Sequence, residues 1–262
     1  TFATAEAISL PLSGWLGMRF GLVRVFMVST FVFTLASVLC SLSVSFPMLL
    51  GARVLQGMTG AAMVPLAQAL LVSCYPPHKR GFALGMWTMT AILAPIVAPL
   101  IAGWITENLS WRWIFLVNVP VGLVVLSLSA ALLRPRETST RSVPVDWTGL
   151  VLLTVGVGSL QLMLDRGNHL DWFDSGTIIA IACIAVVALA SLVAWELTDE
   201  HPIVNLRLLA RRNFAIGSVC IFLGSVAFFG TLVTLPLWLQ TYYGYTSLWA
   251  GKAVATGGLF AV

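Results

Sequence analysis

Charged residues are scarce in this 262-residue chain, because Asp, Glu, Lys and Arg together make up only 9% of it. Apolar residues make up 59%, and the mean hydropathy is +0.96. A water-soluble globule cannot hide this much apolar surface in its own interior. The composition therefore excludes a soluble domain and places the chain in a bilayer.

Familiar catalytic patterns are also missing. The chain has no HExxH pair, no GxSxG elbow and no nucleotide-binding glycine loop, which metalloproteases, serine hydrolases and P-loop enzymes use. The four cysteines, Cys40, Cys74, Cys183 and Cys220, lie in or at the ends of apolar segments without paired spacing. We therefore expect that the chain is not an enzyme and holds no cofactor or metal ion. The possibility that a separate ATPase protein supplies energy is left open.

Apolar runs of about 20 residues recur along the chain, which is the length that a helix needs to cross a bilayer. They lie near residues 1–17, 25–45, 48–73, 82–105, 113–133, 148–164, 176–196, 213–237 and from 248 onward. The pattern predicts an all-α membrane protein with about seven complete helices and two truncated ones. We interpret the chain as a fragment without a signal peptide, because it begins and ends inside apolar segments.

The net charge of +4 would suit nucleic acid, but the placement of the basic residues indicates membrane topology instead. Alternate loops hold nearly all of them, whereas the opposite loops hold only Arg112 and Arg166. This asymmetry predicts that the basic loops face the cytoplasm. The basic set comprises Arg19, Arg24, Lys79, Arg80, Arg134, Arg136, Arg141, Arg207, Arg211 and Arg212.

Two polar cytoplasmic connectors, residues 134–147 and 197–212, divide the chain. Residues 1–133 hold five apolar segments, which we interpret as the second to sixth helices of an N-terminal six-helix bundle. Residues 148–196 are predicted to form an inserted two-helix hairpin that packs outside the two bundles. Residues 213–262 are then the start of a C-terminal bundle.

An arginine lies inside the fourth-helix segment LLGARVLQGMTGAA, residues 49–62. A guanidinium in a bilayer is expected to face the bundle interior or a water-filled cavity with a partner. Gln56 shares the helix face of Arg53 and could satisfy it. The alternative is that Arg53 snorkels to the external interface.

Glu6 is the only carboxylate well inside an apolar segment. About eleven residues separate it from the turn at Gly17, which places it near mid-bilayer depth at 1.5 Å per residue. Desolvation favours the neutral form of a carboxylate, so we expect Glu6 to load and release a proton. Alternatively, it lines a wet cavity and binds a cationic substrate. Asp165 and Glu196 lie at segment ends and are expected to be interfacial.

Two further motifs combine glycines with helix breakers or charge. The segment GMWTMTAILAPIVAPLIAG, residues 85–103, places alanines four apart and ends at Gly103, so a neighbouring helix can approach closely. Pro95 and Pro99 each remove a backbone hydrogen bond and predict a bend. The segment GWLGMRFGLVR, residues 14–24, is predicted to be a cytoplasmic loop, in which Gly14 and Gly21 allow a tight turn and Arg19 can latch onto helix ends or lipid headgroups.

These motifs resemble those of the major facilitator superfamily. Residues 14–24 resemble its loop signature, with Met18 at the usual Asp position, and residues 49–62 resemble its fourth-helix motif, which includes Gln56 and Gly57. Residues 85–103 resemble its antiporter motif, with alanines replacing three glycines. The string WRWIFLVNVPVG, residues 111–122, is similar to that of drug:proton antiporters with fourteen spans, the EmrB/QacA type. Within this type, the chain resembles the EmrB branch most closely.

The resemblance implies a proton-coupled antiporter in the bacterial inner membrane that exports drugs or other amphipathic toxic compounds. Proton coupling would fall to Glu6 and Arg53. Resemblance to the EmrB branch also implies a periplasmic adaptor (membrane fusion) protein and an outer-membrane channel, whereas QacA-like relatives work alone. Two alternatives stay open, which are an importer of a small nutrient and a non-transporting scaffold subunit.

Overall fold

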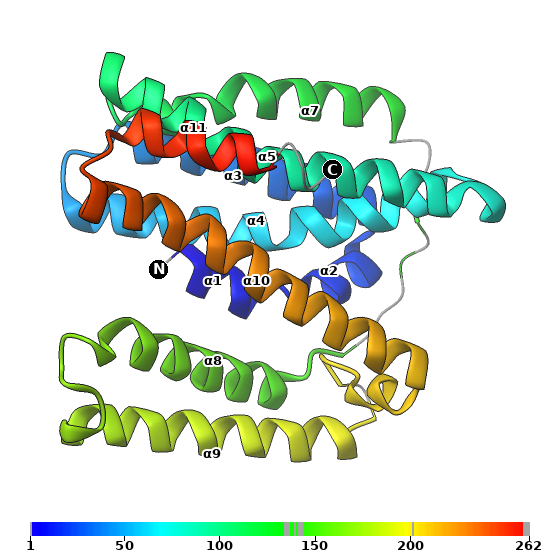
Figure 1. Cartoon of the computed structure of the whole chain (residues 1–262). Helices are drawn as coiled ribbons and strands as arrows, with labels where there is room; N and C mark the ends of the chain where they lie inside the picture. The colour runs from blue at the N-terminus through cyan, green and yellow to red at the C-terminus, as the bar shows by residue number, and fades with distance from the viewer. Residues whose placement is uncertain (1, 134–136, 139, 141–143, 201, 259–262) are drawn as a thin grey trace. The chain divides into compact units, whose positions relative to one another are not determined.

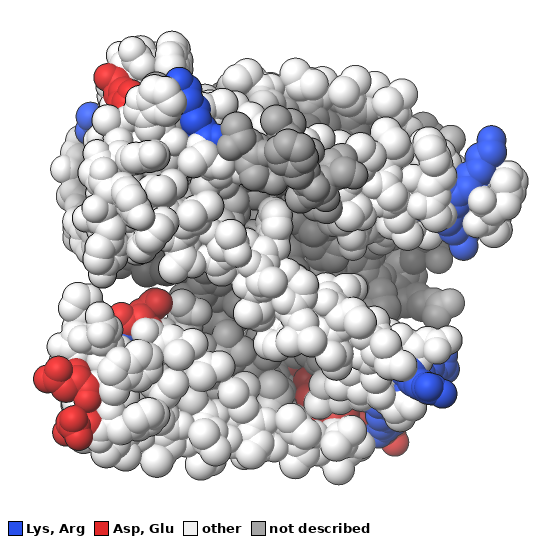
Figure 2. Space-filling model, viewed as in Figure 1, with Lys and Arg blue, Asp and Glu red and all other residues white. Residues whose placement is uncertain are grey.

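The computed structural model describes residues 2–133, 137–138, 140, 144–200 and 202–258 (Figure 1). Every regular element in these residues is helical, and seven helical segments are long and apolar enough to cross a membrane. They are Leu22–Ser41, Phe46–Cys74, Pro77–Asn108, Trp113–Leu132, Trp147–Gly167, Gly176–Thr198 and Arg212–Tyr243. The predicted fold class is confirmed. Charged side chains are few on the face drawn in Figure 2, where most of the surface is uncharged.

The helices fall into two compact units. Unit 1 comprises Thr1–Ala67 and Val119–Leu208, and unit 2 comprises Gln68–Asn118 and Leu209–Val262. Helix α4 (Phe46–Cys74) contributes to both. The short helices α1 (Phe2–Ser9) and α2 (Leu12–Phe20) belong to unit 1, together with α3 (Leu22–Ser41).

Helix α3 buries apolar residues near its N-terminus, such as Val23 and Phe26, and mainly small or hydroxyl-bearing residues from Ser29 onward. Thr30 Oγ1 donates to the carbonyl of Phe26 at 2.8 Å, and Thr34 Oγ1 donates to the carbonyl of Thr30 at 2.7 Å. These bonds satisfy the hydroxyls within the helix. Small residues let neighbouring helices come close, which is how helices associate in membranes without a hydrophobic driving force.

Helices α8 (Trp147–Gly167) and α9 (Gly176–Thr198) form a hairpin in unit 1 (Figure 1). The short 3-10 helix η3 (Trp172–Asp174) lies between them in the chain. The two helices pack against each other, and Leu153 of α8 and Ile178, Ala185 and Leu192 of α9 are buried. Helix α1 also contacts α8. The hairpin is thus present, while its place outside a transport core stays a prediction.

Two expected continuous segments are interrupted. The first segment breaks between α1 and α2 at Leu10 and Pro11, where proline has no amide to continue the helical ladder. Residues 113–133 divide into α6 (Trp113–Leu116) and α7 (Asn118–Leu132), just before Pro120. The predicted loop at residues 14–24 is also mostly helical, and only Gly21 lies between α2 and α3.

Unit 2 contains α5 (Arg80–Asn108), α10 (Arg212–Tyr243) and α11 (Ser247–Gly258), together with α6 and the short helix η1 (Pro77–Lys79). Helix α11 packs against both α5 and α10. Helix α10 extends beyond the predicted residues 213–237, and Gly244 ends it with a φ of 66°. Glycine adopts this left-handed conformation without a Cβ penalty, which makes it a common helix stop.

Candidate functional site

Arg53 takes part in a hydrogen-bonded network inside unit 1. Its Nη1 donates to Gln56 Oε1 at 2.9 Å, and Gln56 Nε2 donates to Ser37 Oγ on α3 at 2.7 Å. Ser37 Oγ in turn donates to the carbonyl of Phe33 at 3.0 Å. The guanidinium also lies 4.7 Å from the ring centroid of Phe2 on α1, within the range of a cation–π interaction. The arginine charge is therefore stabilised by α1, α3 and α4 together.

Gly57 lets α1 approach α4 beside this network. A Cβ on Gly57 would collide with the carbonyl oxygen of Phe2 and would lie 3.0 Å from Ala5 Cβ. Any larger residue would have to push α1 away from α4. The glycine of the fourth-helix motif is thus required for the contact between Phe2 and Arg53.

Glu6 lies one helical turn from Phe2 on α1, so both side chains share a helix face. Its side chain is half-buried and makes no hydrogen bond or ion pair with the described residues. Because Phe2 contacts Arg53, the structure brings Glu6 into the neighbourhood of the network without pairing the two charges. Their proposed coupling roles stay predictions.

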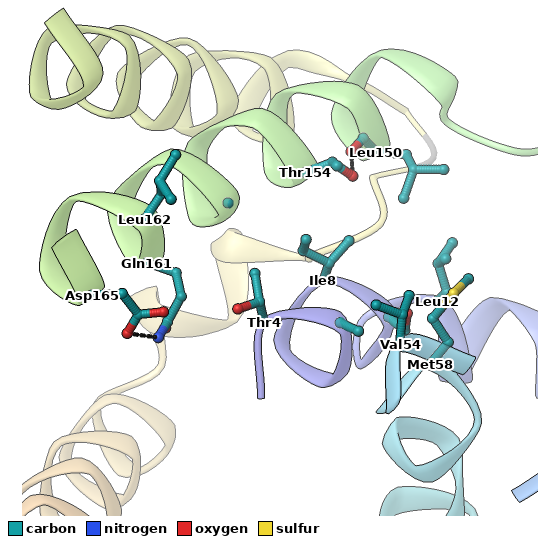
Figure 3. Close-up of a pocket in the computed structure, with 13 residues that line it drawn as sticks. Thr4, Ile8, Leu12, Val54, Met58, Leu150, Thr154, Gln161, Leu162 and Asp165 are labelled. Atoms are coloured by element: carbon teal, nitrogen blue, oxygen red, sulfur yellow. Dashed lines mark hydrogen bonds between the residues drawn. The ribbon is translucent and has the colours of Figure 1, made fainter. Parts of the chain in front are cut away.

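A pocket of about 640 Å³ opens on the other side of α1 and α4 (Figure 3). Its walls come from α1 (Thr4 and Ile8), α4 (Val54 and Met58) and α8 (Leu150 to Asp165). Most of the lining is apolar, but Gln161 Nε2 donates to Asp165 Oδ1 at 3.0 Å at one end. Gln56 is two residues from both Val54 and Met58, which is about half a helical turn. The network and the pocket therefore occupy different faces of α4.

The loop motif is held by a residue that sequence reasoning missed. Gly21 has a φ of 93°, and a Cβ there would collide with the carboxylate of Glu137. Glu137 accepts hydrogen bonds from the amides of Val23 at 3.1 Å and Arg24 at 3.0 Å. Anionic acceptors favour a helix N-terminus, so the connector caps α3. The sequence offered one indication of this role. Met18 leaves the loop without its usual acidic residue, so a carboxylate from another segment could be expected there.

The other loop residues make simpler contacts. The guanidinium of Arg19 lies 5.2 Å from the ring centroid of Trp15 and 5.8 Å from that of Phe20. A Cβ on Gly14 would meet nothing within 4 Å. Arg19 thus stacks on aromatic rings of its own helix, and Gly14 is not needed for a close approach in unit 1.

The predicted antiporter motif lies on α5 in unit 2. Ala94 and Ala98 are exposed, Pro95 is half-buried and Gly103 is buried. The side chain of Pro99 lies outside the described residues. The helix is continuous from Arg80 to Asn108, and the roles of the prolines in bending it stay predictions.

Glu196, near the end of the hairpin where α8 begins and α9 ends, corrects an expectation. Glu196 is fully buried, with 0% of its surface exposed, rather than interfacial. Asp146, just before α8, is only 8% exposed. The correction has a physical reason, because the chain after α9 folds back and the amide of Val204 donates to Glu196 Oε2 at 3.1 Å. Asp165 is exposed, as expected.

The seven apolar helical segments and the arginine network define a multi-pass helical membrane protein with polar groups inside its bundle. The Major Facilitator Superfamily model matches residues 1–262. The chain belongs to this superfamily, and it is a multi-pass protein of the bacterial inner membrane.

Characterised relatives match over the whole chain. It is 49% identical over 262 residues to the multidrug export protein EmrB of Escherichia coli and 48% identical to EmrB of Haemophilus influenzae. It is 44% identical to the fatty acid resistance protein FarB of Neisseria gonorrhoeae. These matches cover 100% of the chain but 51–52% of each relative. The resemblance to the EmrB branch is confirmed, and the chain spans about half the length of these relatives.

Proposed function

We propose that this chain forms part of a proton-coupled antiporter that exports drugs or other amphipathic toxic compounds across the inner membrane. The observation that carries the proposal is the identity of 48–49% to two multidrug export proteins, which extends over all 262 residues. Rocking of two bundles around a central site is the general mechanism of such transporters.

The pocket of unit 1 supports the proposed substrate class. Its walls are mostly apolar side chains, including Met58, and the one charged group among its described lining residues, Asp165, is paired with Gln161. Methionine adapts to ligands of many shapes. An amphipathic molecule could place its apolar part against α1 and α4 and its polar part near Asp165 of α8. In this proposal α8 lines the substrate site, which replaces the expectation that the whole hairpin lies outside the transport core. The relative FarB is a fatty acid resistance protein, and fatty acids are amphipathic compounds.

For energy coupling we propose that Glu6 carries the proton and that Arg53 responds to its charge. Glu6 has no described partner that would hold it permanently ionised, whereas Arg53 is held by Gln56 and Phe2. Protonation of Glu6 would remove a negative charge from the neighbourhood of Arg53. The loss of this charge would change the electrostatic attraction between α1 and α4 and so favour a movement of α1, while the hydrogen bond between Gln56 and Ser37 stays in place.

The partners of the exporter are part of the proposal. As in the EmrB branch, we propose that a periplasmic adaptor and an outer-membrane channel carry the substrate onward. Co-purification of the intact transporter with a periplasmic adaptor tests this point. Recovery of full export in cells that lack any adaptor would instead favour a protein that works alone.

Inside-out vesicles containing the intact transporter test the central proposal. The lumen of these vesicles corresponds to the periplasm, so an acidic lumen reproduces the inward proton gradient of the cell. Under this gradient a fluorescent amphipathic cation should accumulate in the lumen. A protonophore should abolish the accumulation. Accumulation that persists with the protonophore, or movement of substrate only out of the vesicles, would contradict proton-coupled export. The second result would instead favour an importer.

A further inference from the structure

The buried carboxylates of the hairpin are separate from the Arg53 network. Asp146 is the residue before α8, and Glu196 lies in the last turn of α9. Both are more than nine-tenths buried. Neither residue belongs to the network that includes Gln56 and Ser37.

Each carboxylate has one satisfied and one unsatisfied oxygen. Asp146 Oδ1 accepts from the amide of Gly149 at 2.8 Å and from Trp195 Nε1 at 3.0 Å. Glu196 Oε2 accepts from the amide of Val204. The other oxygens, Asp146 Oδ2 and Glu196 Oε1, are buried and have no hydrogen-bond partner among the described residues.

The two unsatisfied oxygens point toward the same place. A Cβ on Gly149 would collide with Asp146 Oδ2 and would lie 3.0 Å from Glu196 Oε1. Both oxygens therefore border the small space beside the backbone of Gly149. A glycine at this position keeps that space open.

The surrounding charges do not neutralise the pair. The N-terminus of α8 favours the negative charge of Asp146, but Glu196 lies at the C-terminal end of α9, where the helix dipole disfavours an anion. Asp199 adds a further negative charge nearby. Arg207 donates to the carbonyls of Leu197 and Asp199 rather than to either buried carboxylate. Among the described residues, neither Asp146 nor Glu196 takes part in an ion pair, whereas Arg24 and Glu137 form one.

We propose that Asp146 Oδ2 and Glu196 Oε1 together bind one small monovalent cation, which is either a proton or an alkali-metal ion. Two ionised carboxylates that share a buried site repel each other strongly, and a single bound cation removes this repulsion. A proton on one of the two oxygens lets that oxygen donate a hydrogen bond to the other. An alkali-metal ion gives both oxygens a ligand bond instead.

The bound cation would link three segments of unit 1. Asp146 belongs to the connector before α8, Glu196 to the end of α9, and Val204 to the connector that follows α9. Loss of the cation would leave two buried charges at this junction. The site therefore stabilises the cytoplasmic end of the hairpin, and it is distinct from the proton carrier proposed at Glu6.

The test measures the melting temperature of the purified intact transporter as a function of cation. In the proton case, the melting temperature falls as the pH rises at constant salt, because loss of the proton leaves two buried charges. In the alkali-metal case, Na⁺ or K⁺ at constant high pH raises the melting temperature of the intact transporter by roughly 3–5 °C at about 100 times the Kd. Tris or N-methylglucamine at equal ionic strength serves as the control cation.

Glu196→Gln should remove the dependence in either case, because an amide at this position can donate to Asp146 Oδ2 and carries no charge. Asp174→Asn, in the exposed η3 segment, is the matched control and should behave as the wild type does. If Glu196→Gln does not fold, Asp146→Asn and the infrared band of a protonated carboxyl group in the wild type provide the readout. The proposal would be overturned if the wild-type melting temperature responded to pH and alkali-metal ions no differently from that of Glu196→Gln or Asp146→Asn.

Discussion

Replacement of Gln56 by Leu tests whether the Arg53 network stabilises the bundle. Gln56 is 2% exposed, accepts from Arg53 at 2.9 Å and donates to Ser37 at 2.7 Å. In a soluble protein, loss of one charged and one neutral hydrogen bond would cost about 2–4 kcal/mol. Side-chain hydrogen bonds in membrane proteins average only about 0.6 kcal/mol each. We therefore expect the free energy of unfolding to fall by about 1–2 kcal/mol.

Reversible unfolding of the intact transporter in mixed micelles measures this change. Thr59→Val on the same helix is the control, because Thr59 Oγ1 donates only to carbonyls of its own helix, those of Leu55 and Gln56. A double-mutant cycle with Ser37→Ala should give a coupling of about 0.5–1 kcal/mol, since the two residues share a hydrogen bond. If Gln56→Leu is no less stable than Thr59→Val, the network does not hold α3 and α4 together.

Three other substitutions probe the coupling carboxylate, the helix contact and the cap. Glu6→Gln should abolish proton-driven export in vesicles but preserve drug binding and insertion, because the amide cannot carry a proton; continued uphill transport would place the coupling carboxylate elsewhere. Gly57→Val should lower the free energy of unfolding by about 1–3 kcal/mol through overpacking against Phe2, whereas Gly51→Val, in open space on the same helix, should not. Glu137→Ala should cost about 1 kcal/mol and speed amide exchange at the start of α3, and unchanged exchange there would contradict the cap.

The membrane-spanning helices could be predicted because bilayer thickness limits their length. The segment predicted at residues 176–196 corresponds to α9, Gly176–Thr198. The segment predicted at residues 25–45 corresponds to α3, Leu22–Ser41, and starts earlier because Gly21 and Glu137 define its N-terminus. Hydropathy detects the apolar run, but capping groups decide where the helix begins.

The side of a helix on which a polar residue lies was also partly predictable. Arg53 and Gln56 are three residues apart and meet as helical geometry requires. The third member, Ser37, lies on another helix, and nothing in the sequence distinguishes it from the other two serines of α3. Local spacing identifies pairs within a helix, whereas contacts between helices depend on packing that the pattern does not encode.

Glu196 shows why depth along a helix is an incomplete guide to the environment of a charge. Its position at the end of an apolar segment predicted contact with water, yet the residue is fully buried. The burial arises because the following connector returns to place Val204 against Glu196, and hydropathy assigns that connector only as a polar loop.

Met18 and Glu137 extend this argument to the loop motif. Met18 stands where an acidic residue is usual. The sequence of the motif alone therefore indicates that it has no carboxylate. Glu137 nevertheless supplies a carboxylate to the N-terminus of α3, from a connector far along the chain. The favourable interaction of an anion with free amides depends on where the charge lies in space and not on which residue carries it. The absence of the acidic residue from a motif therefore does not mean that its carboxylate is absent from the fold, because a distant segment can supply the same chemical group.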